Sequence, residues 1–365
     1  MKELIFDSVI LKNTNRYSSE FSLPDYIYAE DGTLDREKTL ELMLSEVYGF
    51  VNTKDIRIDV TCIGEKPKKV YAGKGKTHKT LEFSFTRGDM TRSFPVDLFL
   101  PSGTDNAPMV VALDFPISVE KCYCPLEEIL GQNVAVARIL YTDVATDDND
   151  FEKGLAPLLS DRTDPHSAGK LAMWAYAASV VGGYMLDNGY VEAGKLFVSG
   201  HSRLGKTALL AAAIDTRFAG AHSNNSGCTG VAISREKEGE SVNIITDWFP
   251  YWFAPNYRKY ADRETEMPFD QHYMTALIAP RFLSVATAEE DTWADTYAQY
   301  LSLEAASVIY RKHGLTGLDP SMGLMQTGMS NALGEIGLTM RQGTHYFSRD
   351  DWGFFLAFMK NKLGL

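Results

Sequence analysis

The chain has 365 residues and a formal net charge of −12, with 45% hydrophobic and 23% charged residues. That much apolar material is enough for a large buried core and excludes a predominantly disordered chain. The negative charge disfavours nucleic acid and anionic membrane surfaces, so neither is expected as a partner.

The start of the chain lacks the pattern of a secretion signal. Asp7 and Lys12 interrupt the apolar stretch, where a signal peptide needs an unbroken apolar region. We therefore expect a cytoplasmic protein, or a mature secreted form with a replaced start. The longest nearly uncharged run, residues 171–186, is shorter than the roughly 20 residues of a membrane span and indicates a buried helix.

The N-terminal residues 1–55 are expected to be a segment appended to one catalytic domain at 56–365. Apolar residues at helical spacing predict a helix over 39–48. Three runs that alternate apolar and polar residues then predict antiparallel strands, at 56–61, 80–86 and 94–100.

After about residue 107 the pattern changes to continuous apolar runs. Such runs predict strands buried on both faces, as in a parallel sheet covered by helices. The expected strands are at 109–113, 134–137, 195–199, 218–223, 281–287 and 337–341, and the expected helices at about 166–187, 203–213 and 350–358. This alternation predicts an α/β fold, a three-layer sandwich whose mostly parallel sheet follows antiparallel leading strands.

An irregular, aromatic stretch at about 229–270 lies between two predicted strands. A large insertion at such a place is expected to cap or line a site.

The most informative string is Gly200-His-Ser-Arg-Leu-Gly-Lys206, between an apolar strand and a helix. Strand, sharp turn and helix are the setting of a nucleophile elbow, which predicts the α/β-hydrolase fold with Ser202 as nucleophile. The usual G-x-S-x-G pattern is broken, because Leu204 precedes Gly205. A helix-capping role is the alternative for this serine. The backbone N–H and the guanidinium of Arg203 are candidates to stabilise an oxyanion.

A serine nucleophile needs a base, and in this fold the triad runs in the order Ser, acid, His. His222 falls in a predicted strand, His272 is expected on a helix surface, and His313 closes a helix. His345 follows the last predicted strand and is therefore the candidate base.

The acid is expected on the loop after the 281–287 strand, where four carboxylates compete. Asp291 has the usual spacing and is preferred as the group that fixes the histidine tautomer. Asp295 is an alternative that would also suit a helix cap, and Glu289 and Glu290 are more typical of solvated side chains.

With these residues in place, the chain resembles the glucuronoyl esterases of carbohydrate esterase family 15, bacterial branch, over roughly residues 90–360. The strings that carry the resemblance are Gly200-His-Ser-Arg-Leu-Gly-Lys206, Ser223-Asn-Asn-Ser-Gly-Cys228, Phe269-Asp-Gln-His272, Leu277-Ile-Ala-Pro-Arg281, Asp291-Thr-Trp-Ala-Asp295 and Gly343-Thr-His345.

The resemblance implies hydrolysis, through an acyl-enzyme, of esters that join 4-O-methyl-glucuronic acid of xylan to lignin alcohols. It implies Ser202 as nucleophile, His345 as base and Arg203 as an oxyanion ligand. In the fungal branch the acid is a glutamate at the position of Asn225, which cannot serve. The resemblance therefore favours Asp291.

The resemblance also implies that Lys206 and Trp293 contact the uronic acid. Glu240 and Arg235 are weaker candidates for sugar contacts. A solvated lysine on the helix surface remains the alternative for Lys206, and simple packing is the alternative for Trp293. Trp248 and Trp252 are equally compatible with core, lid or sugar platform.

Other functions stay open. An acetyl xylan esterase or another carbohydrate esterase would use the same triad, as would a peptidase of this fold. A binding module on a degenerate hydrolase fold is the non-enzymatic alternative, which the intact Ser, Asp and His disfavour.

No Cys/His cluster has zinc-site spacing. The sequence implies neither a metal nor an organic cofactor. Four cysteines in a chain of this length do not make a disulfide scaffold, but a single disulfide is compatible with the sequence. They are Cys62, Cys122, Cys124 and Cys228. We expect a monomer that takes glucuronoxylan fragments as its substrate.

Overall fold

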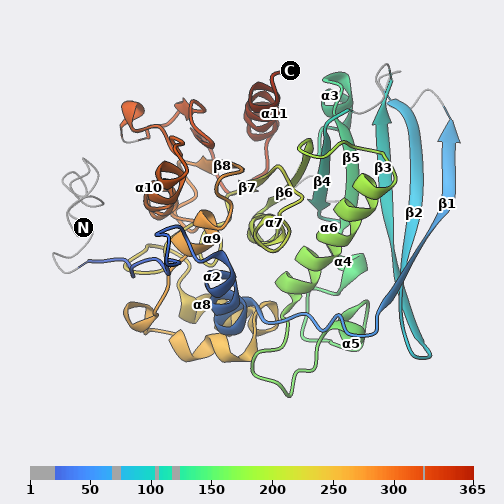
Figure 1. The fold of residues 1–365 in the computed structure, drawn as a ribbon, viewed down its shortest axis with the longest axis horizontal. Helices are drawn as coiled ribbons and strands as arrows, with labels where there is room; N and C mark the ends of the chain where they lie inside the picture. Colours follow the sequence, from blue (N-terminus) through green and yellow to red (C-terminus); the bar gives the residue numbers. More distant parts are fainter. Residues whose placement is uncertain (1–20, 68–74, 103–106, 117–123, 324) are drawn as a thin grey trace.

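The computed structural model describes residues 21–67, 75–102, 107–116, 124–323 and 325–365 (Figure 1). Within them, ten strands form one sheet in the order β1-β2-β3-β5-β4-β6-β7-β8-β10-β9. The strands are β1 (Arg57–Pro67), β2 (Gly75–Arg87), β3 (Met90–Pro101), β4 (Met109–Asp114), β5 (Ala135–Leu140), β6 (Leu196–His201), β7 (Gly220–Asn224), β8 (Phe282–Ala288), β9 (Ser330–Asn331) and β10 (Ile336–Arg341).

Helices cover both faces of this sheet (Figure 1). The α-helices are α2 (Arg36–Met43), α3 (Leu126–Gly131), α4 (Tyr141–Val144), α5 (Ala156–Leu159), α6 (Lys170–Asp187), α7 (Arg203–Ile214), α8 (Val242–Trp248), α9 (His272–Ala276), α10 (Thr296–Lys312) and α11 (Arg349–Leu363). Short helical turns of other types are η1 (Leu44–Tyr48), η3 (Pro250–Trp252), η4 (Pro255–Tyr260), η5 (Glu264–Glu266) and η6 (Pro320–Met322).

The sheet topology confirms the predicted α/β fold. β1, β2, β3 and β5 pair antiparallel in succession, and β5, β4, β6, β7, β8 and β10 are all parallel. β9 adds a short antiparallel edge. Parallel strands joined by helices place their carboxyl ends on one edge of the sheet, where loops assemble a site.

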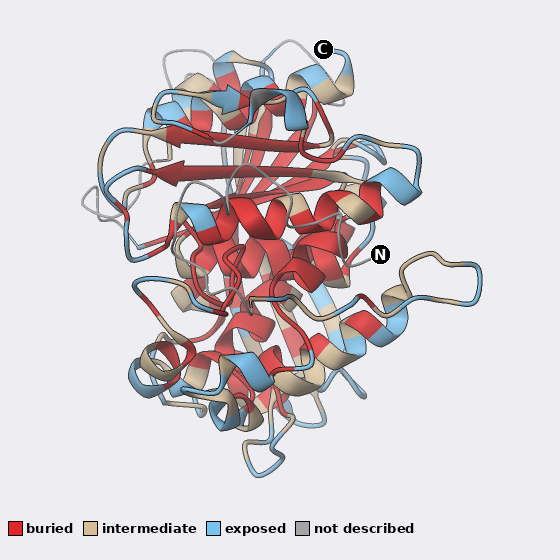
Figure 2. Ribbon diagram, turned by 90° about the vertical axis from the view of Figure 1, so that its left-hand side faces the viewer, coloured by how far each residue is buried: buried red, intermediate tan, exposed pale blue. Residues whose placement is uncertain are grey.

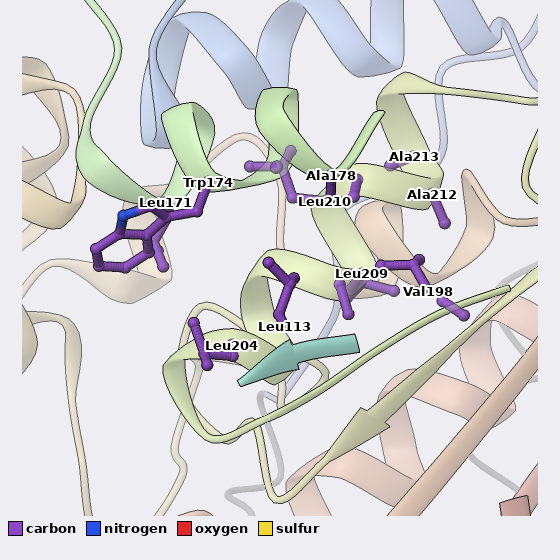
Figure 3. Close-up of a cluster of buried hydrophobic side chains, with 14 of the residues drawn as sticks. Leu113, Leu171, Trp174, Ala178, Val198, Leu204, Leu209, Leu210, Ala212 and Ala213 are labelled. Atoms are coloured by element: carbon purple, nitrogen blue, oxygen red, sulfur yellow. The ribbon is translucent and has the colours of Figure 1, made fainter. Parts of the chain in front are cut away.

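Two apolar clusters hold the three layers together. In the larger one, Leu171 and Trp174 of α6 and Leu209 of α7 lie beside Leu113 of β4 and Val198 of β6 (Figure 3). The smaller cluster lies between the sheet and the helices α3 and α11. Buried residues follow the strands and inner helix faces (Figure 2). Each fully buried large apolar side chain contributes about 1.5–3 kcal/mol, so α7 is firmly held against the sheet.

The described part of the N-terminal segment packs onto the same core. Met43, Val47 and Tyr48 belong to the larger cluster, and the Arg36 guanidinium donates to the carbonyl of Leu277 over 3.1 Å. A domain boundary at residue 55 stays a prediction.

The predicted helix at 39–48 forms as α2 followed by η1, and the long helix begins at Lys170 rather than near 166. The reason is that the backbone at 166–169 bonds elsewhere. Phe50 N–H donates to the carbonyl of His166 over 2.8 Å, and Gly169 N–H donates to that of Tyr48 over 2.9 Å. Among the described helices, none has the length and apolarity that crossing a bilayer requires.

Candidate active site

Ser202 stands at the turn between β6 and α7. Its backbone has φ +57° and ψ −124°, a left-handed conformation that non-glycine residues adopt at a cost of about 1–3 kcal/mol. The Ser202 side chain makes no capping hydrogen bond to α7. The helix-capping alternative is therefore wrong, and the hydroxyl is directed to another use.

Two glycines make this sharp turn possible. A Cβ on Gly200 would lie 2.2 Å from the carbonyl oxygen of Leu204, and one on Gly205 would lie 2.9 Å from that of Asn224. Leu204 itself is buried in the core. The second glycine is thus needed at 205, where α7 approaches β7, which explains the departure from G-x-S-x-G.

The structure brings Ser202, His345 and Asp291 together from the carboxyl ends of β6, β10 and β8. His345 Nε2 lies 2.8 Å from the Ser202 hydroxyl oxygen, and His345 Nδ1 lies 2.6 Å from Asp291 Oδ2. The His345 side chain is 39% exposed and that of Asp291 2%. This is the arrangement of nucleophile, base and orienting acid.

The other three carboxylates of the loop take different positions. Asp295 caps α10, because its Oδ1 accepts from Ala298 N–H over 3.0 Å, and its Oδ2 accepts from Glu238 N–H over 2.8 Å. Glu289 and Glu290 are exposed. Of the four, Asp291 is the one that bonds to His345.

The environment of Asp291 favours its charged form. Burial raises the pKa of this carboxyl, but the hydrogen bond and charge of His345 and the hydrogen bond from Asn225 outweigh burial and lower the pKa below its usual value. The Ala294 N–H also donates to Asp291 Oδ1, over 3.2 Å. An ionised, fixed Asp291 can hold Nδ1–H of His345 and leave Nε2 facing the serine.

Asn225 is a participant that sequence reasoning did not assign. It follows β7 with φ +44°, and its amide donates to Asp291 Oδ2 over 2.6 Å. The sequence could not predict this hydrogen bond, because Asn225 and Asp291 lie on two loops 66 residues apart.

Arg203 begins α7, where the first N–H groups of a helix lack intrahelical partners. Its guanidinium forms an ion pair with Asp147 and lies over the ring of Trp252, 4.7 Å from the centroid. Asp147 also accepts from Trp252 Nε1 over 2.7 Å and from the Tyr141 hydroxyl over 2.8 Å. Asp147 was missed because its polar loop, Thr146-Asp-Asp-Asn-Asp150, has the composition of an ordinary solvated turn.

A cavity of about 170 Å³ opens at Ser202. Its walls include Arg203, Lys206, Asn225, Glu240, Trp248, Phe249, Trp252, Trp293 and His345. The aromatic insertion thus lines the site, as expected of residues 229–270.

Lys206 is a buried residue rather than a solvated one. Its Nζ donates to the carbonyl of Ser226 over 2.6 Å and pairs with Glu240 Oε2 at 3.2 Å. Trp293 is 39% exposed beside it. Lys206, Glu240 and Trp293 therefore form a wall with charged, hydrogen-bonding and flat apolar surfaces.

Arg235 is not brought to this cavity. Its guanidinium bonds to Asp270 at 3.0 Å and to the carbonyl of Phe269 over 2.8 Å, and it also donates to the carbonyl of Met267. These contacts tie the ends of the aromatic insertion together.

A larger cavity of about 510 Å³ lies across the 289–296 loop. Glu238, Glu289, Asp295 and Tyr297 help to line it, together with Asp291, but Ser202 and His345 do not. Ser202 and His345 therefore face the smaller cavity.

The remaining histidines after Ser202 have other positions. His222 lies in β7 and His313 caps α10, as predicted. The prediction that His272 lies on a helix surface is wrong. His272 is buried under the N-terminal segment, where its Nε2 bonds to the carbonyl of Pro24 over 3.1 Å and Tyr26 packs against its ring.

Among the described residues, no group of three or more His, Cys, Asp and Glu side chains is placed to hold a metal ion. Cys62, Cys124 and Cys228 are free thiols, while Cys122 lies outside the described residues. The expectation about secretion rests on residues 1–20, which also lie outside them.

An open, mostly parallel sheet with helices on both faces and a strand–turn–helix elbow defines the class of α/β hydrolases. The chain belongs to the glucuronyl esterase family, because the family model described as "Glucuronyl esterase, fungi" matches residues 83–314. Membership confirms the resemblance drawn from the site motifs.

Individual relatives agree with this assignment. The chain is 37% identical over 237 residues to "Carbohydrate esterase MZ0003" from an unknown prokaryotic organism, covering 64% of this chain and 54% of the relative. It is 27% identical over 256 residues to a 4-O-methyl-glucuronoyl methylesterase of Podospora anserina, covering 67% and 51%. The chain thus spans about half the length of these curated relatives.

A glucuronoyl esterase from Solibacter usitatus has a similar solved structure. It superposes with a TM-score of 0.83 at 28% identity, covering 93% of this chain and 97% of that one.

Proposed function

We propose that the protein hydrolyses carboxylic esters of 4-O-methyl-glucuronic acid, of the kind that links glucuronoxylan to lignin, through a Ser-His-Asp triad. The observation that carries the proposal is the pair of hydrogen bonds from Ser202 through His345 to Asp291, beside a cavity that Lys206, Glu240 and Trp293 help to line. Family membership supports the substrate class.

In the first half of the reaction, His345 Nε2 removes the proton of the Ser202 hydroxyl as its oxygen attacks the ester carbon of the uronate. The negative charge that forms on the carbonyl oxygen is stabilised by the N–H at the start of α7 and by the Arg203 guanidinium. His345 then donates the proton to the departing alcohol oxygen. A uronoyl ester of Ser202 remains.

In the second half, water takes the place of the alcohol. His345 removes a proton from the water as its oxygen attacks the acyl carbon, and returns that proton to the Ser202 oxygen as the ester bond breaks. Asp291 stays ionised throughout and stabilises the imidazolium. The products are the free uronate and the regenerated serine.

Lys206, Glu240 and Trp293 are proposed to recognise the acyl part. Glu240 offers an acceptor for sugar hydroxyls, and the Trp293 ring offers a flat surface for the apolar face of the pyranose. Lys206 Nζ donates to Ser226, Cys228 and Glu240, so it would reach a sugar hydroxyl by exchanging one of these three acceptors. Arg235, whose guanidinium bonds to Phe269, Asp270 and Met267 within the insertion, is proposed to act on the sugar only by holding that wall in place.

The test compares a benzyl or methyl glucuronate ester with acetylated xylan and an aryl acetate, on wild type and on Ser202→Ala. We expect kcat/KM to favour the glucuronate ester strongly and to fall by about 10⁴-fold or more in the variant. Preference for acetyl esters would retain the triad and refute the substrate class. Full activity of Ser202→Ala would refute the mechanism.

A further inference from the structure

Trp248 is an exposed aromatic side chain at the rim of the catalytic cavity, and the proposed mechanism gives it no role. It ends α8, lines the cavity with Ser202 and is 60% exposed. Its ring stacks on Trp293, with centroids 5.6 Å apart and planes at 22°. Two adjoining exposed indoles at a cavity mouth make a contiguous apolar surface, which typically marks a binding site.

Hydrogen bonds connect this indole pair to the wall proposed to hold the acyl group. Glu240 accepts from Lys206, and its own N–H donates to the carbonyl of Trp293 over 3.2 Å. α8 begins two residues after Glu240, at Val242. The alcohol, by contrast, leaves towards His345, which protonates it. Trp248 therefore extends the acyl side of the site.

The size of the cavity limits what it can enclose. Its volume of about 170 Å³ is below the roughly 300–1,000 Å³ of pockets that bury a drug-sized ligand. One sugar ring fills such a space, so any sugar attached to the uronate must lie outside it, over the rim. The indole pair forms part of that rim.

We propose that Trp248 stacks on the neutral pyranose ring to which the uronic acid is attached, so that the rim is a subsite for a xylan-type saccharide. This inference rests on the proposed function. An indole face excludes water from the C–H face of a pyranose. A neutral ring also meets no repulsion from the acidic protein.

The test measures three substrates: methyl glucuronate ester, benzyl glucuronate ester, and the methyl ester with its uronate attached to a xylo-oligosaccharide. We expect Trp248→Ala to lower kcat/KM for the oligosaccharide by about three- to tenfold, through KM, and for both small esters by less than about twofold. Trp248→Phe should keep most of the preference. Tyr28→Ala, which removes an aromatic side chain 41% exposed away from the cavity, should change none of the three.

An equal loss on all three substrates would overturn the proposal, since Trp248 would then serve the uronate or the shape of the cavity. If Trp248→Ala lowered kcat/KM for the benzyl ester much more than for the methyl ester, Trp248 would contact the alcohol, and the proposal would be overturned.

Binding provides an arm that does not depend on turnover. On the Ser202→Ala background, calorimetry with the unesterified glucuronoyl xylo-oligosaccharide should show a similar loss of affinity when Trp248→Ala is added. Wild type that cleaves no glucuronate ester would refute the proposed function alone. Unchanged oligosaccharide affinity in the double variant would refute the subsite.

Discussion

Asn225 and His345 donate to the same oxygen of Asp291, Oδ2, each over 2.6 Å. Hydrogen bonds to a carboxylate favour its charged form and fix its orientation. Asn225 is therefore a positioning residue, which acts on the serine through Asp291 and His345.

Changing Asn225 should alter the pH dependence of the reaction as well as its rate. Asn225→Gly tolerates the positive φ and deletes the amide, so we expect kcat/KM to fall by about 10–100-fold. Asn225→Asp places a second carboxylate against Asp291 and raises the pKa of the pair. As the pH is lowered, kcat/KM of this variant should therefore begin to fall at a higher pH than kcat/KM of wild type. An unaltered acidic limb in Asn225→Asp would contradict this role.

A second comparison identifies the triad acid. Asp291→Asn loses the charge that stabilises the imidazolium, so kcat/KM for a glucuronate ester should fall by about 10³–10⁴-fold. Asp295→Asn is the matched control, because asparagine caps helices well and tolerates the left-handed conformation of that residue, φ +57°. The control should keep activity within a few-fold. The reverse order of losses would assign the acid to Asp295.

Asp147 is predicted to position Arg203. Asp147→Asn keeps the shape of the side chain and removes the charge that pairs with the guanidinium, so we expect kcat to fall by about 10–100-fold with little change in KM. The loss appears in kcat because the oxyanion exists only after attack. Asp148→Asn changes the exposed neighbouring residue and should be neutral. Equal effects of the two substitutions would argue against a specific role for Asp147.

Acid should destabilise the fold through its buried histidines. Burial lowers the pKa of His222 to about 3, against an unfolded value of roughly 6.5. The unfolded chain therefore binds a proton that the native state refuses, so the stabilisation is complete above pH 6.5 and is lost as pH falls towards 3. Between pH 6.5 and 5 this histidine removes about 2 kcal/mol of unfolding free energy.

Urea unfolding across that pH range measures the effect. The slope of unfolding free energy against pH reports how many more protons the unfolded state binds than the native state. In His222→Gln this difference should be smaller by about one proton. His313→Gln, at the exposed end of α10, should leave the slope as in wild type. An identical slope in His222→Gln would mean that His222 is not held neutral.

The triad was predictable because each member follows a strand that is visible in the sequence. Ser202, Asp291 and His345 come after apolar runs, and parallel strands bring such loops to one edge. Asn225 and Asp147 had no comparable local signal, since their roles depend on loops distant in sequence.

His272 shows the same limit for the fold. The helical pattern around it gives no sign that Pro24 and Tyr26 cover it. The N-terminal segment that buries it is irregular at those residues, so periodicity could not reveal the packing.

The left-handed backbone conformation of Ser202 lowers the stability of the fold at the residue proposed as the nucleophile. Glycine adopts positive φ without the steric cost that serine bears, so Ser202→Gly should gain about 1 kcal/mol in stability while losing all nucleophilic function. Directed evolution that selected for thermal stability alone would therefore favour variants that have lost catalytic activity. Screens on this scaffold need turnover as a simultaneous selection, because its most stable descendants are expected to be inactive.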